Sequence, residues 1–477
     1  MRCVGKSRRA GTQLRLTAPR LTRVAAIWCC AASRKTKTMG CTTSKNAKLY
    51  TDKEASLHAI SVDPDGPAPV PLLLRLISAS DLPSHDLLSE SDVFVIAQLL
   101  RPDGKVAAEA TWPVKWDQDS PIWDSCRLVG AAPPGMKGLK LRIKLFDEDE
   151  HVPGKRAPPE LVGVAYIDLD TLPIGGAPAD FDVTPEKKPG EGKRPRVRLQ
   201  RVDAAGMPSK KTLYIVRHGE SVWNKAQAEK DVATMLSTTD HPLNDEGRKQ
   251  AEGLRARLVS AQHGGCAAVE SAVLKAERVV CSPLTRAVQT CLIGMDPLLG
   301  GMATPSVALL PNLREKRNLG GKDSSGKWVG EALVDGIKGA MGELYADDPE
   351  LGARLAAPAL DIGQVGAQWW VGSAESEEAV RARIDDALCQ LRFSPESWAV
   401  IVGHSHYFRE MLRAFCADGC ALYDAAAATE PKEGGMQECC EKKLENAGVA
   451  QLDVDWGMDA DKPIQSVRLL FGTKLVE

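Results

Sequence analysis

Residues 211–221 read Lys-Thr-Leu-Tyr-Ile-Val-Arg-His-Gly-Glu-Ser. The apolar run 213–216 predicts a short buried strand, and Arg217 and His218 follow directly at its end. A fixed positive charge beside a histidine at a strand end is a common arrangement for phosphate chemistry. The Arg-His-Gly triplet alone is a weak signal, because a lone strand-end histidine is more often structural than reactive.

Two later segments strengthen the signal. Residues 281–287, Cys-Ser-Pro-Leu-Thr-Arg-Ala, place Arg286 at a helix start after a short strand, and residues 401–406, Ile-Val-Gly-His-Ser-His, end another apolar run with His404. Arginine side chains stabilise the charge on phosphoryl oxygens without a metal. Two neighbouring cations also lower the pKa of a histidine and keep its lone pair free near pH 7.

In their order along the chain, these motifs resemble those of the histidine phosphatase superfamily, which includes the phosphoglycerate mutases. The resemblance covers residues 211–477. It implies a catalytic His218 that passes through a phosphohistidine, with no cofactor required for catalysis. It also implies a set of side chains that bind the substrate phosphate, made of Arg217, Asn224, Arg286 and His404.

A proton donor for the leaving oxygen is also needed, and carboxylates are a usual choice. Glu315 follows the apolar run 307–310 and resembles the acidic position of the family, so we expect it to be the second catalytic residue. The alternative is a solvated charge among basic neighbours. Glu220 is another donor in principle, although a turn or helix-capping role suits it better, and His406 is either a pocket residue or a helix start.

The choice between phosphatase and mutase depends on the surrounding segments. After Asn224 a mutase usually carries a Phe-x-Gly-Trp stretch, which this chain lacks. We therefore favour a phosphomonoester hydrolase acting on a phosphorylated small molecule or a phosphoprotein. Two alternatives stay open: a phosphoglycerate mutase-like phosphotransferase, and an inactive scaffold. Arg248, Lys249 and the basic run 314–317 either meet a second anionic group or are merely exposed.

Residues 67–202 show short alternating strands with frequent turn signals, which predicts a β-sandwich. The stretches 73–83, 120–124 and 139–149 resemble those of a C2 domain. That resemblance implies docking on an anionic phospholipid membrane. It also implies a calcium site, whose five expected ligands are Asp86, Asp92, Asp147, Asp149 and Glu160. Calcium needs several oxygens from separate loops; alternatively, these acids only solvate loop tips and the domain binds lipid or protein without metal.

Composition narrows the remaining possibilities. The net charge of −2 gives no bias toward nucleic acid, so no nucleic-acid partner is expected. The 13 cysteines are scattered, which favours reduced thiols and a cytoplasmic setting. No apolar run approaches the ~18 residues that a membrane-spanning helix needs.

The amino-terminal residues 1–66 are expected to be disordered. Residues 1–38 are basic and contain no acid, which is compatible with an organelle transit peptide. Read from Met39, the next residues form an N-myristoylation signal with Gly40 as acceptor and Cys41 as a palmitoylation site. Both interpretations cannot hold for one polypeptide, and we favour a start at Met39 and a peripheral membrane location over organelle import.

The sequence therefore predicts a multidomain chain: a C2-like β-sandwich at 67–202, a linker at 203–210, and an α/β three-layer histidine phosphatase-like domain at 211–477. Alternating strand-like and helix-like patterns in the second domain predict a mostly parallel sheet with helices on both faces. Residues 425–435 are expected to form a surface insertion, and residues 443–455 to add edge strands.

Overall fold

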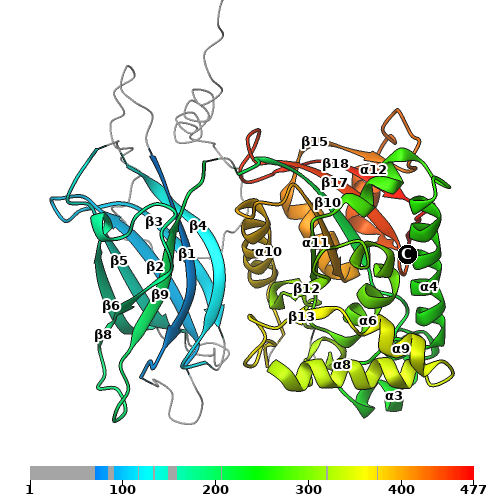
Figure 1. Ribbon diagram of the computed structural model, residues 1–477, viewed down its shortest axis with the longest axis horizontal. Helices are drawn as coiled ribbons and strands as arrows, with labels where there is room; N and C mark the ends of the chain where they lie inside the picture. Colours follow the sequence, from blue (N-terminus) through cyan, green and yellow to red (C-terminus); the bar gives the residue numbers. More distant parts are fainter. Residues whose placement is uncertain are drawn as a thin grey trace, which may run out of the picture.

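The computed structural model describes residues 70–83, 91–115, 118–132, 135–148, 158–205, 207–318, 321–372 and 374–477. A β-sandwich comes first along the chain and an α/β domain follows it, and the two lie beside each other (Figure 1). This is the predicted architecture: a β-sandwich followed by a three-layer α/β domain. Among the helices of these described ranges, none combines the length and apolar character needed to cross a bilayer.

The sandwich consists of two antiparallel sheets. One has the order β4-β1-β9-β7 and the other the order β3-β2-β5-β6-β8. The strands are β1 (Val70–Ser80), β2 (Val93–Leu100), β3 (Val106–Lys115), β4 (Ile122–Ala132), β5 (Lys140–Asp147), β6 (Glu160–Asp168), β7 (Ala179–Asp182), β8 (Thr184–Pro185) and β9 (Arg196–Val202), with a short 3-10 turn η1 (Leu169–Thr171) after β6.

Alternation along the strands explains the sandwich. In β5 the side chains of Leu141, Ile143 and Leu145 are buried while the residues between them are more accessible, because successive side chains point to opposite faces of a strand. They pack in one core with Trp112 and Trp123. Both indole N–H groups donate to backbone carbonyls, so burying these large rings leaves no donor unpaired.

The α/β domain is built on one sheet of order β13-β12-β11-β14-β10-β17-β18-β15. Its strands are β10 (Lys210–Arg217), β11 (Arg278–Cys281), β12 (Ser306–Leu309), β13 (Ala359–Asp361), β14 (Trp398–Gly403), β15 (Cys416–Tyr423), β17 (Val449–Asp455) and β18 (Ile464–Leu470). The pairs from β13 to β10 are parallel, whereas β17 pairs antiparallel with β10 and β18. A small separate sheet joins β16 (Lys443–Leu444) to β19 (Leu475–Val476).

The expectation that residues 443–455 add edge strands is wrong for residues 449–455, although β16 at 443–444 does lie at an edge of the small separate sheet. β17 lies inside the sheet between β10 and β18, and all of its apolar side chains are buried. The alternation of this segment is that of a strand, but alternation does not reveal which strands become its neighbours.

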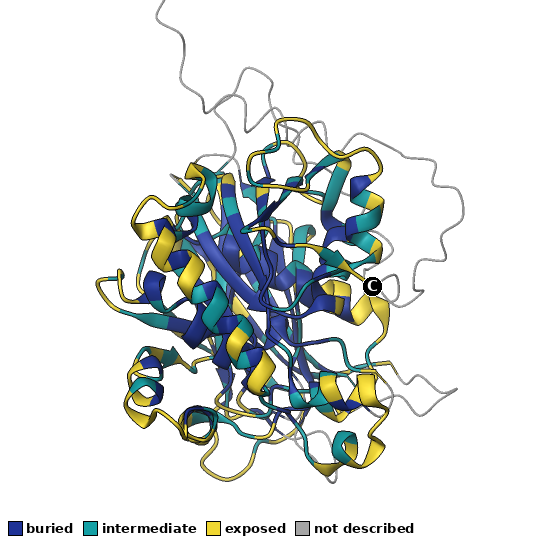
Figure 2. Cartoon of the chain, turned by 90° about the vertical axis from the view of Figure 1, so that its right-hand side faces the viewer, coloured by how far each residue is buried: buried dark blue, intermediate teal, exposed yellow. Residues whose placement is uncertain are grey.

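Helices cover both faces of the sheet. They are α2 (Val222–Glu229), α3 (Val232–Ser237), α4 (Asp245–Gln262), α5 (Ala268–Ser271), α6 (Thr285–Gly294), α7 (Asp296–Leu299), α8 (Gly330–Leu344), α9 (Pro349–Leu355), α10 (Glu377–Arg392), α11 (Ser405–Phe415) and α12 (Gly435–Glu441), with 3-10 turns η2 (Ala272–Lys275), η3 (Pro311–Leu313) and η4 (Lys322–Ser324). One core joins the sheet to α4, α6 and α8, and a second joins it to α10 and α11. Figure 2 shows the buried strands between helices whose outer faces are exposed.

Candidate active site

The site begins with three neighbouring strands that end at one edge of the sheet. β10 and β11 both pair in parallel with β14, so their carboxyl ends lie together. Arg217, the last residue of β10, pairs with Gly403, the last residue of β14. The residues that follow are therefore neighbours, and the ring centroids of His218 and His404 are 5.0 Å apart.

His218 is held in one tautomer. Its Nδ1 lies 2.6 Å from the carbonyl oxygen of Gly219, and since a carbonyl only accepts hydrogen bonds, Nδ1 carries the proton. The lone pair is then on Nε2, which accepts a hydrogen bond from Nε of Arg286 at 3.4 Å. Burial, followed by the charges of Arg286 and Arg217, lowers the pKa of His218 well below its ordinary value. The imidazole is therefore neutral at pH 7, as a nucleophile must be.

Arg217 and Arg286 place two guanidinium groups beside this ring. Arg217 donates from Nη1 to the carbonyl of Leu444 at 2.6 Å, and burial lowers its pKa to about 10, which leaves it cationic at pH 7. Arg286, in the first turn of α6, donates from Nη1 to the carbonyl of Asp323 at 2.6 Å and pairs with the Asp323 carboxylate at 3.5 Å. Both guanidinium groups are almost completely buried, where their charges act more strongly than in water.

His404 completes the set and brings in a residue that sequence reasoning missed. Its Nε2 lies 2.8 Å from the hydroxyl oxygen of Ser282, the first residue after β11. Burial, and then the charge of Arg286, lowers the pKa of His404. The sequence feature that could have identified Ser282 as a site residue is its position at a strand end, within the same motif that contains Arg286.

Asn224 lies in the first turn of α2, close in the chain to His218. Its Oδ1 accepts hydrogen bonds from the backbone N–H and the hydroxyl of Ser221, and the hydroxyl of Ser221 accepts from the N–H of Asn224. This reciprocal pair is a capping box at the start of α2. These hydrogen bonds order the turn that follows His218, and contact of Asn224 with the substrate phosphate stays a prediction.

Glu315 lies just after the η3 turn and is 7% exposed, so the alternative of a solvated charge is wrong. Its Oε1 accepts from the N–H of Lys316 at 2.9 Å and of Tyr407 at 3.1 Å, and its Oε2 from the N–H of His406 at 3.4 Å. Two of these donors belong to the first turn of α11, the helix that directly follows His404. Glu315 is thus fixed at the same strand edge as both histidines.

The other charged candidates are engaged by neighbouring side chains. Glu220 accepts a hydrogen bond from the side-chain amide of Asn244 at 2.6 Å. This contact agrees with the turn role that the sequence favours for Glu220. Arg248 pairs with Asp347 at 2.6 Å. Arg314 is buried and pairs with Glu375.

Sequence reasoning also missed residues that order the segments carrying His218 and Arg286. A Cβ atom on Gly247 would overlap the carbonyl oxygen of Glu220, so α4 approaches the turn after His218 at backbone distance. Asp240 accepts from the N–H and hydroxyl of Thr285 at 2.8 and 2.7 Å, which fixes the start of α6 and hence Arg286. Burial raises the pKa of Asp240 to about 6.

Cationic side chains border the Glu315 side of the site. His406 is exposed, and its Nδ1 accepts from Arg409 at 2.6 Å. Lys443 directly precedes Leu444, and the carbonyl of Leu444 accepts a hydrogen bond from Arg217. Burial lowers the pKa of Lys443, and the charge of Arg217 lowers it further. The charge of Arg409 in turn lowers the pKa of Arg217. A positively charged border therefore adjoins the candidate proton donor.

Comparison with protein families identifies both domains. Residues 71–181 match the C2 domain, and residues 213–320 match the histidine phosphatase superfamily, branch 1. The chain joins a C2 domain to a histidine phosphatase superfamily domain. The matched part of the histidine phosphatase domain includes His218, Arg286 and Glu315, and His404 lies beyond it.

Solved structures resemble each domain separately. An Escherichia coli protein described as an alpha-ribazole-5′-P phosphatase is 16% identical, with a TM-score of 0.29, over 54% of this chain and 94% of its own. A phosphoglycerate mutase from Bacillus anthracis is 16% identical, with a TM-score of 0.27, over 52% and 89%. A C2 domain of plant extended synaptotagmin 1 is 17% identical, with a TM-score of 0.23, over 28% and 94%. None of the curated proteins matches the chain.

In the C2 domain, the expected calcium ligands Asp86 and Asp149 lie outside the described residues, as do Gly40 and Cys41. Oδ1 of Asp147 accepts from the N–H of Asp92 at 2.6 Å, so these two expected ligands are adjacent. Glu160 pairs with Asp147 across the strands and makes an ion pair with Lys187 at 2.9 Å. Within the described ranges, no group of three or more His, Cys, Asp or Glu side chains is arranged to hold a metal. Of the three expected ligands that are described, Asp92 and Asp147 contact each other and Glu160 is engaged by a lysine.

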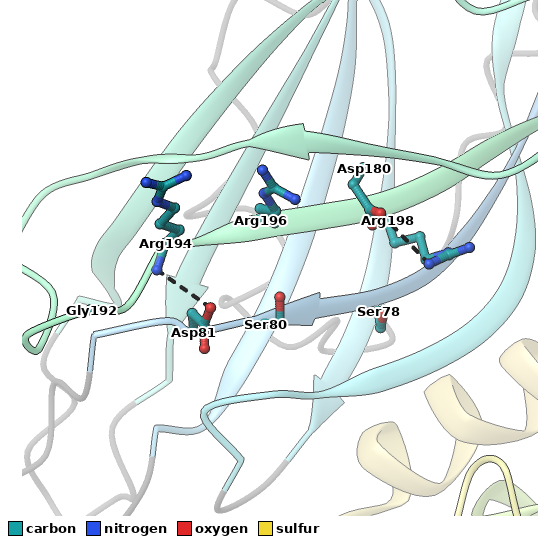
Figure 3. Close-up of a pocket in the computed structure, with 8 residues that line it drawn as sticks. All are labelled: Ser78, Ser80, Asp81, Asp180, Gly192, Arg194, Arg196 and Arg198. Carbon is teal, nitrogen blue, oxygen red and sulfur yellow. Dashed lines mark hydrogen bonds and ion pairs between the residues drawn. The ribbon is translucent and has the colours of Figure 1, made fainter.

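A surface pocket of about 480 Å³ opens over strands β1, β9 and β7, on one face of their sheet in the C2 domain (Figure 3). Arginines project from β9 and the segment before it, and carboxylates face them. Arg198 pairs with Asp180 at 3.6 Å and Arg196 with Asp182 at 3.2 Å, while the backbone N–H of Arg194 donates to Asp81 at 3.4 Å. Two of these arginines already have carboxylates beside them, so an anionic ligand here would have to compete with the protein's own acids.

Proposed function

We propose that the protein is a phosphomonoester hydrolase whose reaction passes through a phosphohistidine at His218. The observation that carries this proposal is the hydrogen bond from Nδ1 of His218 to the carbonyl of Gly219, which leaves the Nε2 lone pair facing Arg286. A neutral, oriented imidazole beside two buried arginines is what nucleophilic attack on a phosphate monoester needs. Arg217 and His218 come from the end of β10, and Arg286 comes from the start of α6, which follows β11 of the same sheet.

In the proposed first step, Arg217, Arg286 and His404 bind the non-bridging phosphoryl oxygens. Nε2 of His218 attacks phosphorus, the bond to the ester oxygen breaks, and that oxygen takes the proton of the Glu315 carboxyl group as it leaves. In the second step, water attacks the phosphohistidine and gives a proton to the Glu315 carboxylate, which releases inorganic phosphate and restores the imidazole. The arginines supply the charge stabilisation throughout.

The cationic border suggests the kind of substrate. Glu315 serves the leaving group in this mechanism, so groups beside Glu315 face the leaving group. Arg409 and Lys443 lie there, and we expect substrates whose leaving group carries a further negative charge. The same feature keeps a phosphoglycerate mutase-like phosphotransferase as the second candidate, because a mutase holds a second anionic group during transfer. A panel of phosphorylated metabolites, inositol phosphates and phosphopeptides, scored for both phosphate release and isomerisation, separates the two.

Glu315→Gln tests the proton donor. The amide keeps the size of the side chain but has no acidic proton, so kcat for an alkyl phosphate should fall roughly 10²- to 10⁴-fold. An activated aryl phosphate should be much less affected, because its leaving group departs without protonation. Steady-state rates on the two substrates give the comparison.

Glu220→Gln is the matched control, since Glu220 is a nearby carboxylate engaged by Asn244. This variant should change kcat for the alkyl phosphate and for the aryl phosphate to the same extent. If Glu315→Gln slows both substrates to the same extent, Glu315 is not the proton donor.

We also propose that the C2 domain brings the phosphatase to anionic phospholipid membranes with the help of calcium. The contact between the Asp147 carboxylate and the backbone N–H of Asp92 supports this proposal because it brings these two expected ligands together, and calcium binds carboxylates from neighbouring loops and bridges them to lipid phosphate. Acylation at Gly40 and Cys41 would supply the second anchoring signal that stable attachment needs.

Asp147→Asn combined with Asp149→Asn should weaken calcium-dependent binding to phosphatidylserine vesicles and leave turnover of a soluble substrate unchanged. Co-sedimentation with vesicles measures the first and phosphate release the second. Asp103→Asn, in the turn between β2 and β3 at the opposite end of β2 from Asp92, is the control. Equal binding of the unmutated protein in calcium and in chelator would rule out the metal site.

A further inference from the structure

Helix α10 lies between the two domains (Figure 1). Val380, Ile384 and Leu388 on one side of the helix belong to the core of the phosphatase domain. Asp385 and Asp386 meet strand β4 of the C2 domain. Asp386 is 1% exposed, and a carboxylate at such a depth requires charged or hydrogen-bonding partners.

The C2 domain supplies partners for Asp386. Nη2 of Arg127 in β4 donates to Oδ1 of Asp386 at 3.1 Å, and the hydroxyl of Ser125 donates to the same oxygen at 3.2 Å. Nη1 of Arg127 binds Asp385 at 2.8 Å. Lys115 is a further cation of the C2 domain, buried at the end of β3. Burial lowers the pKa of Lys115, and the charge of Asp386 raises it by a smaller amount. The position of Asp386 is therefore tied to the docked C2 domain.

The second oxygen of Asp386 contacts the phosphatase domain. Oδ2 accepts from the side-chain amide of Asn312 at 2.5 Å and from Gln390 at 3.1 Å. Asn312 lies in the η3 turn that leads to Glu315. One carboxylate thus divides its two oxygens between the C2 domain and the turn that carries the candidate proton donor.

A second contact from α10 holds the backbone of the same turn. Nη1 of Arg383 donates to the carbonyls of Asn312 and Arg314 at 2.9 and 2.8 Å. Arg383 is itself oriented by Glu375, to which its Nε donates at 2.9 Å. A displacement of α10 would therefore move the segment from Asn312 to Glu315 as a unit.

We propose that Arg127 of the C2 domain is a positioning residue for the phosphatase reaction: through Asp386 and Asn312 it sets the place of Glu315 relative to His218. The inference rests on the proposed function of these two residues. Its physical basis is that proton transfer to the leaving oxygen depends steeply on donor position, while buried, hydrogen-bonded ion pairs such as Arg127–Asp386 admit few alternative arrangements. Docking of the C2 domain thereby completes the active site of its neighbour.

The test uses Arg127→Lys and Arg127→Met in the full chain, with the same alkyl and activated aryl phosphates. We expect kcat for the alkyl phosphate to fall roughly 10- to 100-fold in Arg127→Met, with little change in KM or in turnover of the aryl phosphate. Arg127→Lys, which keeps the charge, should recover part of the loss. When Arg127→Met is combined with Glu315→Gln, no further loss should follow, because both act on the same proton transfer.

Arg142→Met is the matched control, because this arginine lies in β5 of the same domain and binds Gln98; it should behave as the unmutated protein. Asn312→Ala breaks the same link from within the phosphatase domain and should give the same selective loss even if the Arg127 variants fold poorly. Equal losses on both substrates, or losses that multiply with Glu315→Gln, would overturn the inference. Absence of a phosphohistidine in the unmutated protein would instead reject the proposed function, and this inference with it.

Discussion

His218→Ala is expected to lower kcat for every phosphomonoester that the protein accepts by roughly 10⁴-fold or more. The variant lacks the Nε2 lone pair that forms the covalent intermediate, whereas the arginines that bind phosphate stay in place. Substrate affinity should therefore persist while turnover disappears. Phosphate release measures turnover, and brief incubation with ³²P-labelled substrate should give an acid-labile label on the unmutated protein and none on the variant.

His263→Ala provides the comparison for this experiment. His263 follows the last turn of α4 and is exposed, so its removal should change neither the rate nor the label. Retention of hydrolysis by His218→Ala, or a label that survives in it, would contradict the phosphohistidine mechanism.

Asp386→Ala is expected to lower the free energy of unfolding by about 3–5 kcal/mol, the usual result of breaking a buried ion pair by removing one partner. The substitution leaves the buried part of the Arg127 guanidinium and the amide of Asn312 without their acceptor. Differential scanning calorimetry is the suitable measurement, because a two-domain chain does not always unfold in one step. We expect the transitions of the two domains to separate in the variant.

Asp385→Ala tests whether burial is the cause. Asp385 binds the same arginine, but its side chain is 46% exposed compared with 2% for Asp386. Exposed ion pairs contribute about 0–1 kcal/mol, so this variant should remain close to the unmutated protein. Similar losses from both substitutions would show that burial of the Arg127–Asp386 pair is not what stabilises the interface.

The strand-end motifs were predictable from the sequence because each is local. Apolar runs before Arg217 and His404, and a short strand and turn before Arg286, place these side chains at one sheet edge without knowledge of any long-range contact. The capping role of Asn224 was also readable, since a residue three positions after Ser221 is placed to close a capping box. The family resemblance adds phosphate binding by Asn224, which stays a prediction.

Long-range partners were not predictable in this way. Asp240 fixes the first residue of α6 from a loop far earlier in the chain, and Ser282 reaches His404 from another strand. Hydrophobic periodicity identifies elements but not their neighbours, which is also why β17 was expected at an edge. The pairing of Arg127 with Asp386 crosses two domains, and neither segment alone carries a signal for the other.

The strand order has a consequence for how the protein is made. β10, which carries Arg217 and precedes His218, pairs with β14 on one side and β17 on the other, and both partners come near the end of the chain. Amino-terminal domains generally fold first during translation, and contacts between distant segments form late. The nascent chain can thus complete its C2 domain before β14 and β17, the two strands that pair with β10, have been synthesised. Reactivity at His218 is therefore among the last properties acquired on the ribosome, and a prematurely released chain would carry the C2 domain without it.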